Sequence, residues 1–221
     1  MESANEVAAS IVAECDALPV QNTSSLRAMR KKYSGMLKEA TGELIVQVAR
    51  EILKTGRYRW IGYELIQANK TASKCLGAAE VEELGEGINS WWTVDAFART
   101  ISGPAWLAGR IPDESIQRWA KSADRWWRRA ALVSTVALNV RSQGGMGDTP
   151  RTLSVCRMLV GDKDDMVVKA MSWALRELVV HNAQAVEAFL EEHDAVLAGR
   201  VKREVRNKLE TGLKYPARKG D

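Results

Sequence analysis

The chain has 221 residues, of which 46% are hydrophobic and 27% charged, and its formal net charge is +4. A chain of this length forms one large domain or two small ones, and it buries about 70% of its unfolded surface. The mildly basic charge permits a nucleic-acid partner without requiring one. The three cysteines are odd in number and far apart, which excludes a disulfide framework and favours thiols in a reducing cytoplasm. The acidic start does not fit a signal peptide, and no apolar run reaches the length of a membrane span.

Helical periodicity dominates the sequence, and strand-like alternation is nearly absent. The five prolines fall near the ends of apolar periodic segments, where helices stop or start. Asp124 and Asp164 are expected to be N-caps. The glycine-rich stretch 144–147 is predicted to be a loop between helices. It lacks the Gly-Lys-Ser/Thr ending of a nucleotide-binding loop, so it is not expected to bind phosphate. The predicted helices span residues 3–18, 24–38, 42–54, 58–69, 79–86, 89–103, 113–121, 124–139, 149–160, 165–181, 183–197 and 200–211.

A weak internal repeat suggests how these helices are arranged. Segments beginning near Tyr58, Ser90, Arg125 and Met166 share a bulky residue followed by small residues and an apolar stripe. Their spacing of roughly 30 to 40 residues is typical of helical-pair repeats such as HEAT. The sequence therefore predicts an all-α fold, a curved solenoid of antiparallel helix pairs. We expect a single domain over residues 1–221, with N-terminal helices in 1–56, tryptophan-rich repeats in 57–181 and basic C-terminal helices in 182–221.

Tryptophans and charged residues gather in three of the predicted helices. The clusters lie in residues 90–95, 124–131 and 169–177. Trp91 and Asp95 are four residues apart and share a helical face, and Trp92 borders that face. Because the three helices occupy equivalent places in successive repeats, their side chains are expected to project onto one concave surface. Aromatic side chains interleaved with arginines and one carboxylate indicate a surface that holds a polyanion.

These clusters resemble motifs of the HEAT-repeat DNA alkylation-repair glycosylases of the AlkD type. Residues 22–30 resemble the family's N-terminal arginine-bearing segment, and Trp91-x-x-x-Asp95 resembles its tryptophan–aspartate pair. Residues 129–132, preceded by Trp126, resemble its arginine helix, and residues 173–177 its final tryptophan segment. Relatives often carry an extra acidic residue after the tryptophan doublet. The retained four-residue spacing favours Trp91 as the functional tryptophan, whereas alignment on the doublet favours Trp92.

The resemblance implies hydrolysis of the N-glycosidic bond of cationic N3- or N7-alkylpurines in double-stranded DNA. It implies a monofunctional, monomeric enzyme with no metal or organic cofactor, cytoplasmic and associated with the nucleoid. Asp95 would stabilise charge on the sugar and position water, while Arg129 would clamp a phosphate and lower the pKa of Asp95. Trp91 and Trp173 would pack against deoxyribose. Further DNA contacts are expected from Arg176, Lys169, Arg128, Trp92, Trp126, Arg27 and Arg30.

Structural roles compete with these assignments. Tryptophans in helical repeats are more often core than site residues. We expect core or partly buried packing for Trp60, Trp106 and Trp119, and a core position for one member of each doublet. His181 and His193 lack metal-ligand spacing and are expected at the surface or at helix caps. The basic C-terminal run is either a solvated helix face or a contact to the DNA backbone. Two other functions stay open: a non-catalytic HEAT-repeat protein that binds distorted or damaged DNA, and a protein-binding scaffold without a positive stripe.

Overall fold

The computed structural model describes residues 3–216, and over this range the chain is built of helices joined by turns and loops. The predicted all-α class is therefore confirmed, and within each compact unit the packing of successive helices is solenoid-like. Contacts gather in two compact units, with the boundary between Gly87 and Ile88. The expected single domain, with segments divided after residues 56 and 181, stays a prediction. Arg218 and Lys219 of the basic C-terminal run lie outside the described residues.

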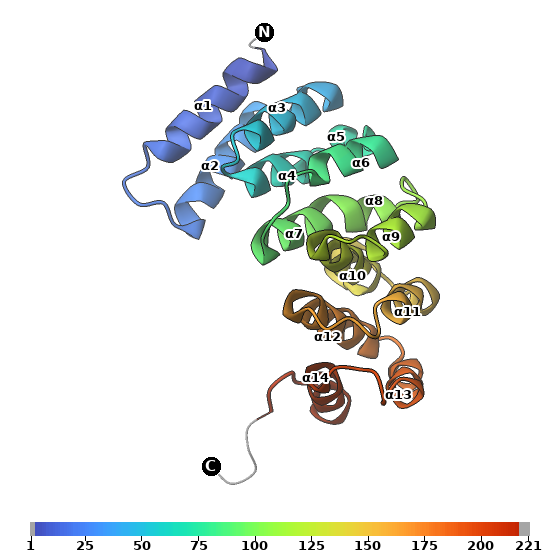
Figure 1. Cartoon of the computed structure of the whole chain (residues 1–221). Coiled ribbons are helices and arrows are strands. Elements are labelled where there is room, and N and C mark those ends of the chain that lie inside the picture. The colour runs from blue at the N-terminus through green and yellow to red at the C-terminus, as the bar shows by residue number, and fades with distance from the viewer. Residues whose placement is uncertain (1–2, 217–221) are drawn as a thin grey trace. The chain divides into compact units, whose positions relative to one another are not determined.

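In the N-terminal unit, α3 is the central helix (Figure 1). It packs against α1, α4 and α5, and its buried face holds Ile45, Val48, Ala49 and Ile52. The N-cap Thr41 accepts a hydrogen bond from the backbone N–H of Leu44, which fixes where α3 begins. The helices of this unit are α1 (Ala4–Asp16), α2 (Thr23–Met36), α3 (Gly42–Lys54), α4 (Arg59–Ala68), α5 (Lys70–Lys74) and α6 (Ala78–Gly85).

In the C-terminal unit, α10 is the central helix, and its residues 129–139 are all buried. It packs against α7, α8 and α9 on the N-terminal side and against α12 on the other, and α12 in turn packs against α14. Helices α9, α11 and α13 follow one another along one side of the stack that α10, α12 and α14 form (Figure 1). The elements are α7 (Trp91–Phe97), η1 (Ala98–Ser102), α8 (Gly103–Leu107), α9 (Asp113–Ala120), α10 (Arg125–Asn139), η2 (Arg141–Gln143), α11 (Thr149–Met158), α12 (Asp165–Val179), α13 (Ala183–Glu192) and α14 (Gly199–Thr211).

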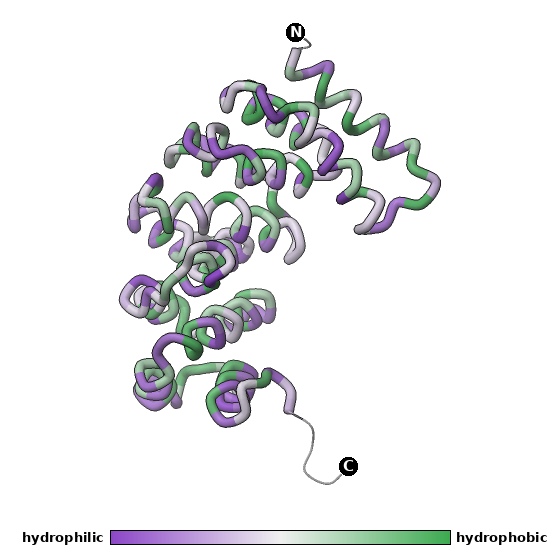
Figure 2. Tube along the Cα trace, turned by 180° about the vertical axis from the view of Figure 1, so that it is seen from behind, coloured by the Kyte–Doolittle hydropathy of each residue, from purple (hydrophilic) through white to green (hydrophobic). Residues whose placement is uncertain are grey.

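Amphipathic stripes explain why these helices stack. Hydrophobic and hydrophilic residues alternate turn by turn along most of them (Figure 2), so each helix must cover its apolar face with a neighbour. Trp106 and Trp119 are 2% and 4% exposed, which confirms their expected place in the core, and Trp60 is half-buried. Within residues 3–216, no helix combines the length and the hydropathy that a membrane span requires.

The predicted end of one helix at residue 103 is wrong. The helical path continues beyond α7 through the π-helix η1 and through α8 to Leu107. Pro104 has no N–H to donate to the preceding turn, and it is tolerated here because it lies in the first turn of α8. The N–H of Gly103 donates to the carbonyl of Ala98, five residues back, as a π turn requires. The short helix α5 was also not predicted. Asn69 is both the C-cap of α4 and the N-cap of α5, and its side chain accepts hydrogen bonds from the backbone N–H groups of Thr71 and Ala72.

Small residues bring the π-helix against α10. The hydroxyls of Ser102 and Ser134 are hydrogen-bonded at 2.7 Å, and both residues are fully buried. A Cβ on Gly103 would lie 2.7 Å from the Cβ of Ala137 and 2.9 Å from the carbonyl oxygen of Ser134. This close approach anchors α7, which carries the candidate site, beside α10.

Candidate functional site

A bidentate ion pair joins α7 to α10. The Nε and Nη2 atoms of Arg129 donate to the two carboxylate oxygens of Asp95 at 2.9 and 2.8 Å. The Arg129 side chain is 6% exposed and that of Asp95 is 18% exposed, so the carboxylate is the member of the pair that reaches solvent. Two parallel charge-assisted bonds fix both the position and the plane of the carboxylate.

The start of α7 sets where Asp95 points. Ser90 is the N-cap, and its hydroxyl and that of Thr93 form a reciprocal capping box. The helix therefore begins at Trp91, and Asp95 follows one turn later on the same face as Trp91. The expected N-cap Asp124 likewise starts α10 by accepting from the N–H of Trp126.

Arg129 is committed to protein acceptors. Besides Asp95, its Nη1 atom donates to the backbone carbonyl of Met166 in α12, so each of its three nitrogens has a protein partner. This buried geometry gives no support to the expected phosphate clamp. Arg129 instead links α7, α10 and α12 and holds the Asp95 carboxylate, which makes it a positioning residue.

Burial raises the pKa of the Asp95 carboxyl above its ordinary value, while the hydrogen bonds and charge of Arg129 and the charge of Arg99 oppose that rise. The expectation that Arg129 lowers the pKa of Asp95 is confirmed for the contribution of Arg129, although burial makes the net change a rise. The loss of hydration outweighs that contribution.

The tryptophans nearest Asp95 in the sequence face solvent. Trp91 is 57% exposed and Trp92 is 45% exposed, so the expectation that one of them is core is wrong. In the second doublet, Trp126 and Trp127 are both half-buried; Trp127 packs against Phe97 with ring centroids 6.0 Å apart. Exposure does not separate Trp91 from Trp92 as the functional residue, but only Trp91 lies a full turn before Asp95.

Trp173 lies on α12 and is half-buried. Its indole N–H donates to Glu177 at 2.9 Å, which fixes the ring. The guanidinium of Arg99 lies over this ring, with its central carbon 5.6 Å from the centroid. Through Arg99, the aromatic ring of α12 is connected to the segment that directly follows Asp95.

Several predicted DNA contacts have structural partners instead. Arg128 donates to Asp162 at 2.7 Å and to the carbonyls of Ser122 and Ala123, which ties it to the neighbouring turns. Lys169 pairs with Asp165 at 2.6 Å on the same helix.

The remaining predicted DNA contacts differ in how exposed their side chains are and in whether they already bind a protein partner. Arg176 is half-buried and donates to Ser172, and burial lowers its pKa. Trp126 is half-buried beneath Arg125, whose guanidinium carbon lies 4.6 Å from the ring centroid. Arg27 and Arg30 belong to α2 of the N-terminal unit, where Arg27 is exposed and Arg30 pairs with Glu64 at 2.9 Å.

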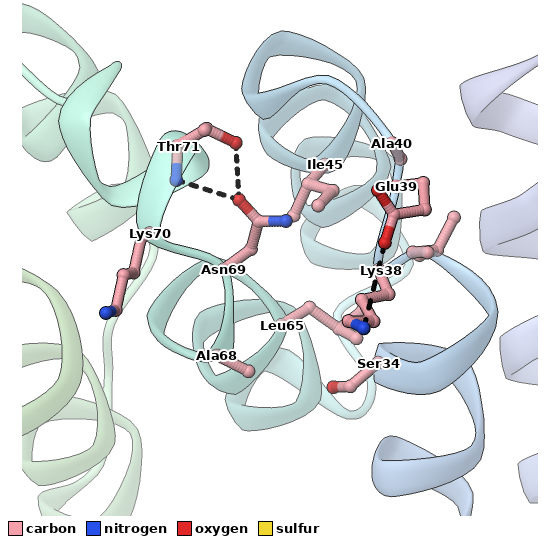
Figure 3. Close-up of a pocket in the computed structure, with 11 residues that line it drawn as sticks. Ser34, Lys38, Glu39, Ala40, Ile45, Leu65, Ala68, Asn69, Lys70 and Thr71 are labelled. Carbon is pink, nitrogen blue, oxygen red and sulfur yellow. Dashed lines mark hydrogen bonds and ion pairs between the residues drawn. The ribbon is translucent and has the colours of Figure 1, made fainter.

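The N-terminal unit contains a cavity of about 510 Å³ between α2, α3, α4 and α5 (Figure 3). Its lining is mixed, with the apolar side chains of Ile45 and Leu65 beside Ser34 and Asn69 (Figure 3). The carbonyl oxygen of the Asn69 side chain is already engaged by Thr71. None of the predicted site residues lines this cavity.

Arg99 lies at this candidate site but was not predicted from the sequence. It follows Asp95 by four residues and Trp91 by eight, so extending the helical face of the Trp91–Asp95 pair by one more turn would have found it. Arg99 is exposed, unlike Arg129, and it contacts Trp173.

Fold and site together define an all-helical, solenoid-like protein that presents a fixed carboxylate near solvent-facing aromatic and cationic side chains. The family model described as "DNA alkylation repair enzyme" matches residues 4–209, and the chain belongs to this family. No curated protein and no solved structure gives a significant match to the chain.

Proposed function

We propose that this protein is a monofunctional DNA glycosylase that hydrolyses the N-glycosidic bond of cationic N3- or N7-alkylated purines in duplex DNA. The observation that carries the proposal is the Asp95 carboxylate, held by both of its oxygens yet still reaching solvent. It lies one helical turn after Trp91, and Arg99, one turn further on, contacts Trp173. Membership in the alkylation repair family supplies DNA as the substrate.

The chemistry of the lesion explains why one carboxylate suffices. Most glycosidases use two carboxyl groups, one of which protonates the leaving group. An alkylated purine that already carries a positive charge departs as a neutral base, because the electron pair of the breaking C1′–N bond neutralises it. No general acid is needed, and positive charge develops on the sugar instead.

Asp95 then has two tasks. Its negative charge stabilises the cationic sugar as the bond breaks. A water molecule adds its oxygen to C1′ and loses a proton to the carboxylate or to solvent, which leaves an abasic site. Burial makes Asp95 a stronger proton acceptor by raising its pKa, while Arg129 favours the ionised form that both tasks require.

The flanking side chains orient the sugar. The exposed indole of Trp91 and the fixed ring of Trp173 offer flat apolar surfaces against deoxyribose. Such contacts position the sugar over the carboxylate and exclude bulk water from it.

The test is release of 7-methylguanine from methylated duplex DNA, measured by chromatography, for the wild type and for Asp95→Asn. We expect the variant to lose on the order of 100- to 1000-fold in single-turnover rate, because a charge-stabilising group is removed. Asp162→Asn is the matched control. Asp162 pairs with Arg128, which precedes Arg129 on α10, and this ion pair is buried to a similar extent as the Asp95–Arg129 pair. Release by Asp95→Asn at the wild-type rate would refute the proposal.

A second candidate is a non-catalytic protein that binds damaged DNA. The observation that favours it is that both oxygens of Asp95 accept hydrogen bonds from Arg129, an arrangement that also suits a purely structural ion pair. Salt-sensitive binding of damaged duplex without release of any base by the wild type would select this candidate.

A further inference from the structure

The guanidinium of Arg129 is buried and already donates to Asp95 and Met166. Its charge is also balanced by the carboxylate that it holds. A phosphate beside the lesion therefore needs another cation, one close to Asp95 and open to solvent.

We propose that Arg99, which makes a cation–π contact with Trp173, is the residue that binds the DNA phosphate next to the sugar at Asp95. This inference rests on the proposed function, because it places the reacting nucleotide over Asp95. It assigns to an exposed side chain the contact that the sequence pattern suggested for Arg129.

The position of Arg99 supports this role. It lies one turn beyond Asp95, at the second residue of η1, and its side chain is exposed. Its charge lowers the pKa of Asp95, so the two side chains are near enough to interact. Among the described residues, no carboxylate forms an ion pair with Arg99, whereas Arg128 and Lys169 are both paired.

The cation–π contact with Trp173 prepares the guanidinium for an anion. The central carbon of the guanidinium lies 5.6 Å from the ring centroid, so the indole restricts the side chain of Arg99 without taking up its N–H donors. An arginine fork of this kind matches two oxygens of one phosphate. The ring is itself fixed by Glu177, so little side-chain freedom is lost when the phosphate binds.

The location of η1 strengthens the assignment. The π-helix carries Arg99 on its exposed side, and its carbonyl at residue 99 accepts a hydrogen bond from the side chain of Gln143. The backbone of Arg99 is thus held from α10's C-terminal side, while its side chain reaches α12. Arg99 therefore lies between Asp95 and Trp173, the two residues that are proposed to contact the sugar.

The experiment measures binding to a duplex that contains one tetrahydrofuran abasic-site analogue, with single methylphosphonates placed in turn at each neighbouring linkage. For the wild type, we expect one linkage whose neutralisation weakens binding on the order of tenfold. For Arg99→Gln, neutralising that same linkage should have little further effect. The slope of log affinity against log salt should also fall by about one unit in the variant.

Arg157→Gln is the control, because Arg157 is exposed on α11 and its removal should leave both the methylphosphonate pattern and the salt slope unchanged. Arg99→Lys keeps the charge and loses the fork, so it should keep the slope but bind more weakly. Wild-type methylphosphonate penalties in Arg99→Gln, or an unchanged slope, would overturn the inference.

These binding readouts are independent of base release. A wild type that releases no 7-methylguanine would defeat the proposed function and leave the phosphate assignment to be decided by the duplex measurements. A wild type that releases base normally while Arg99→Gln binds as the wild type does would defeat only the phosphate assignment.

Discussion

Replacing Arg129 with methionine separates the positioning of Asp95 from simple packing. Methionine replaces the aliphatic stem of arginine and carries no guanidinium, so the stem packing is kept while Asp95 loses both donors. The side chains are 6% and 18% exposed, so solvent screens their interaction little. Removing one partner of a buried pair costs about 3–5 kcal/mol in free energy of unfolding, which denaturant titration measures.

The same change has a pH signature. Arg129 opposes the rise in the pKa of Asp95 that burial causes, so Arg129→Met should raise this pKa further. Asp95 is then protonated over a wider pH range, and the acid limb of base release should move to higher pH. Activity lost near neutral pH should partly return in alkaline buffer.

The stability of Arg129→Met should depend on pH in the opposite direction from its activity, recovering in acid rather than in alkaline buffer. A carboxyl whose folded pKa lies above its unfolded pKa destabilises the fold when it ionises, and this cost disappears as the pH falls below both values. The difference in unfolding free energy between Arg129→Met and the wild type should therefore narrow in acid.

Arg128→Met is the control for both measurements. Arg128 precedes Arg129 on α10 and pairs with Asp162, which lies in the loop before α12. Breaking this pair should cost stability without moving the acid limb of base release. If the acid limb stays in place in Arg129→Met, or moves equally in Arg128→Met, Arg129 does not act through the ionisation of Asp95.

Two further predictions concern the tryptophan doublet and the π-helix. Trp91→Ala should reduce base release more than Trp92→Ala, because only Trp91 shares the face of Asp95; both are exposed, so neither should change the unfolding free energy by more than about 0.5 kcal/mol. An equal or larger loss for Trp92→Ala would instead assign the sugar contact to Trp92. Gly103→Ala should destabilise the fold by about 1–3 kcal/mol in denaturant unfolding, because its Cβ would lie 2.7 Å from Ala137; Gly161→Ala, with no atom within 4 Å, is the control, and equal costs for both would rule out the steric cause.

Local signals account for most of the helices predicted from the sequence. The predicted range 42–54 matches α3, because Thr41 caps its start and its apolar stripe runs to its end. The π-helix was not predicted, because it results from Pro104 and from the packing of small residues against α10, which depends on tertiary structure.

For the site, the repeat spacing brought Asp95 and Arg129 together correctly, although they are 34 positions apart. The direction of each guanidinium was beyond the sequence pattern. Arg129 turns inward to the carbonyl of Met166, and Arg128 turns to Asp162, because α10 packs where those acceptors lie. Arg99 was not predicted as a site residue, because the predicted functional face ends at Asp95 and Arg99 lies one turn further on.

The π turn of η1 also acts as a phase adjustment within one continuous helical rod. One residue corresponds to about 100° of rotation about a helix axis. Deleting a single residue from 98–102 would turn the π-helix into a regular α-helix. If Asp95 kept its orientation, Trp106 would then rotate out of the core. The direction of the Asp95 carboxylate and the direction of the buried Trp106 indole about the helix axis are thus set independently. The π turn between them allows one continuous helix to point the first toward solvent and the second into the core.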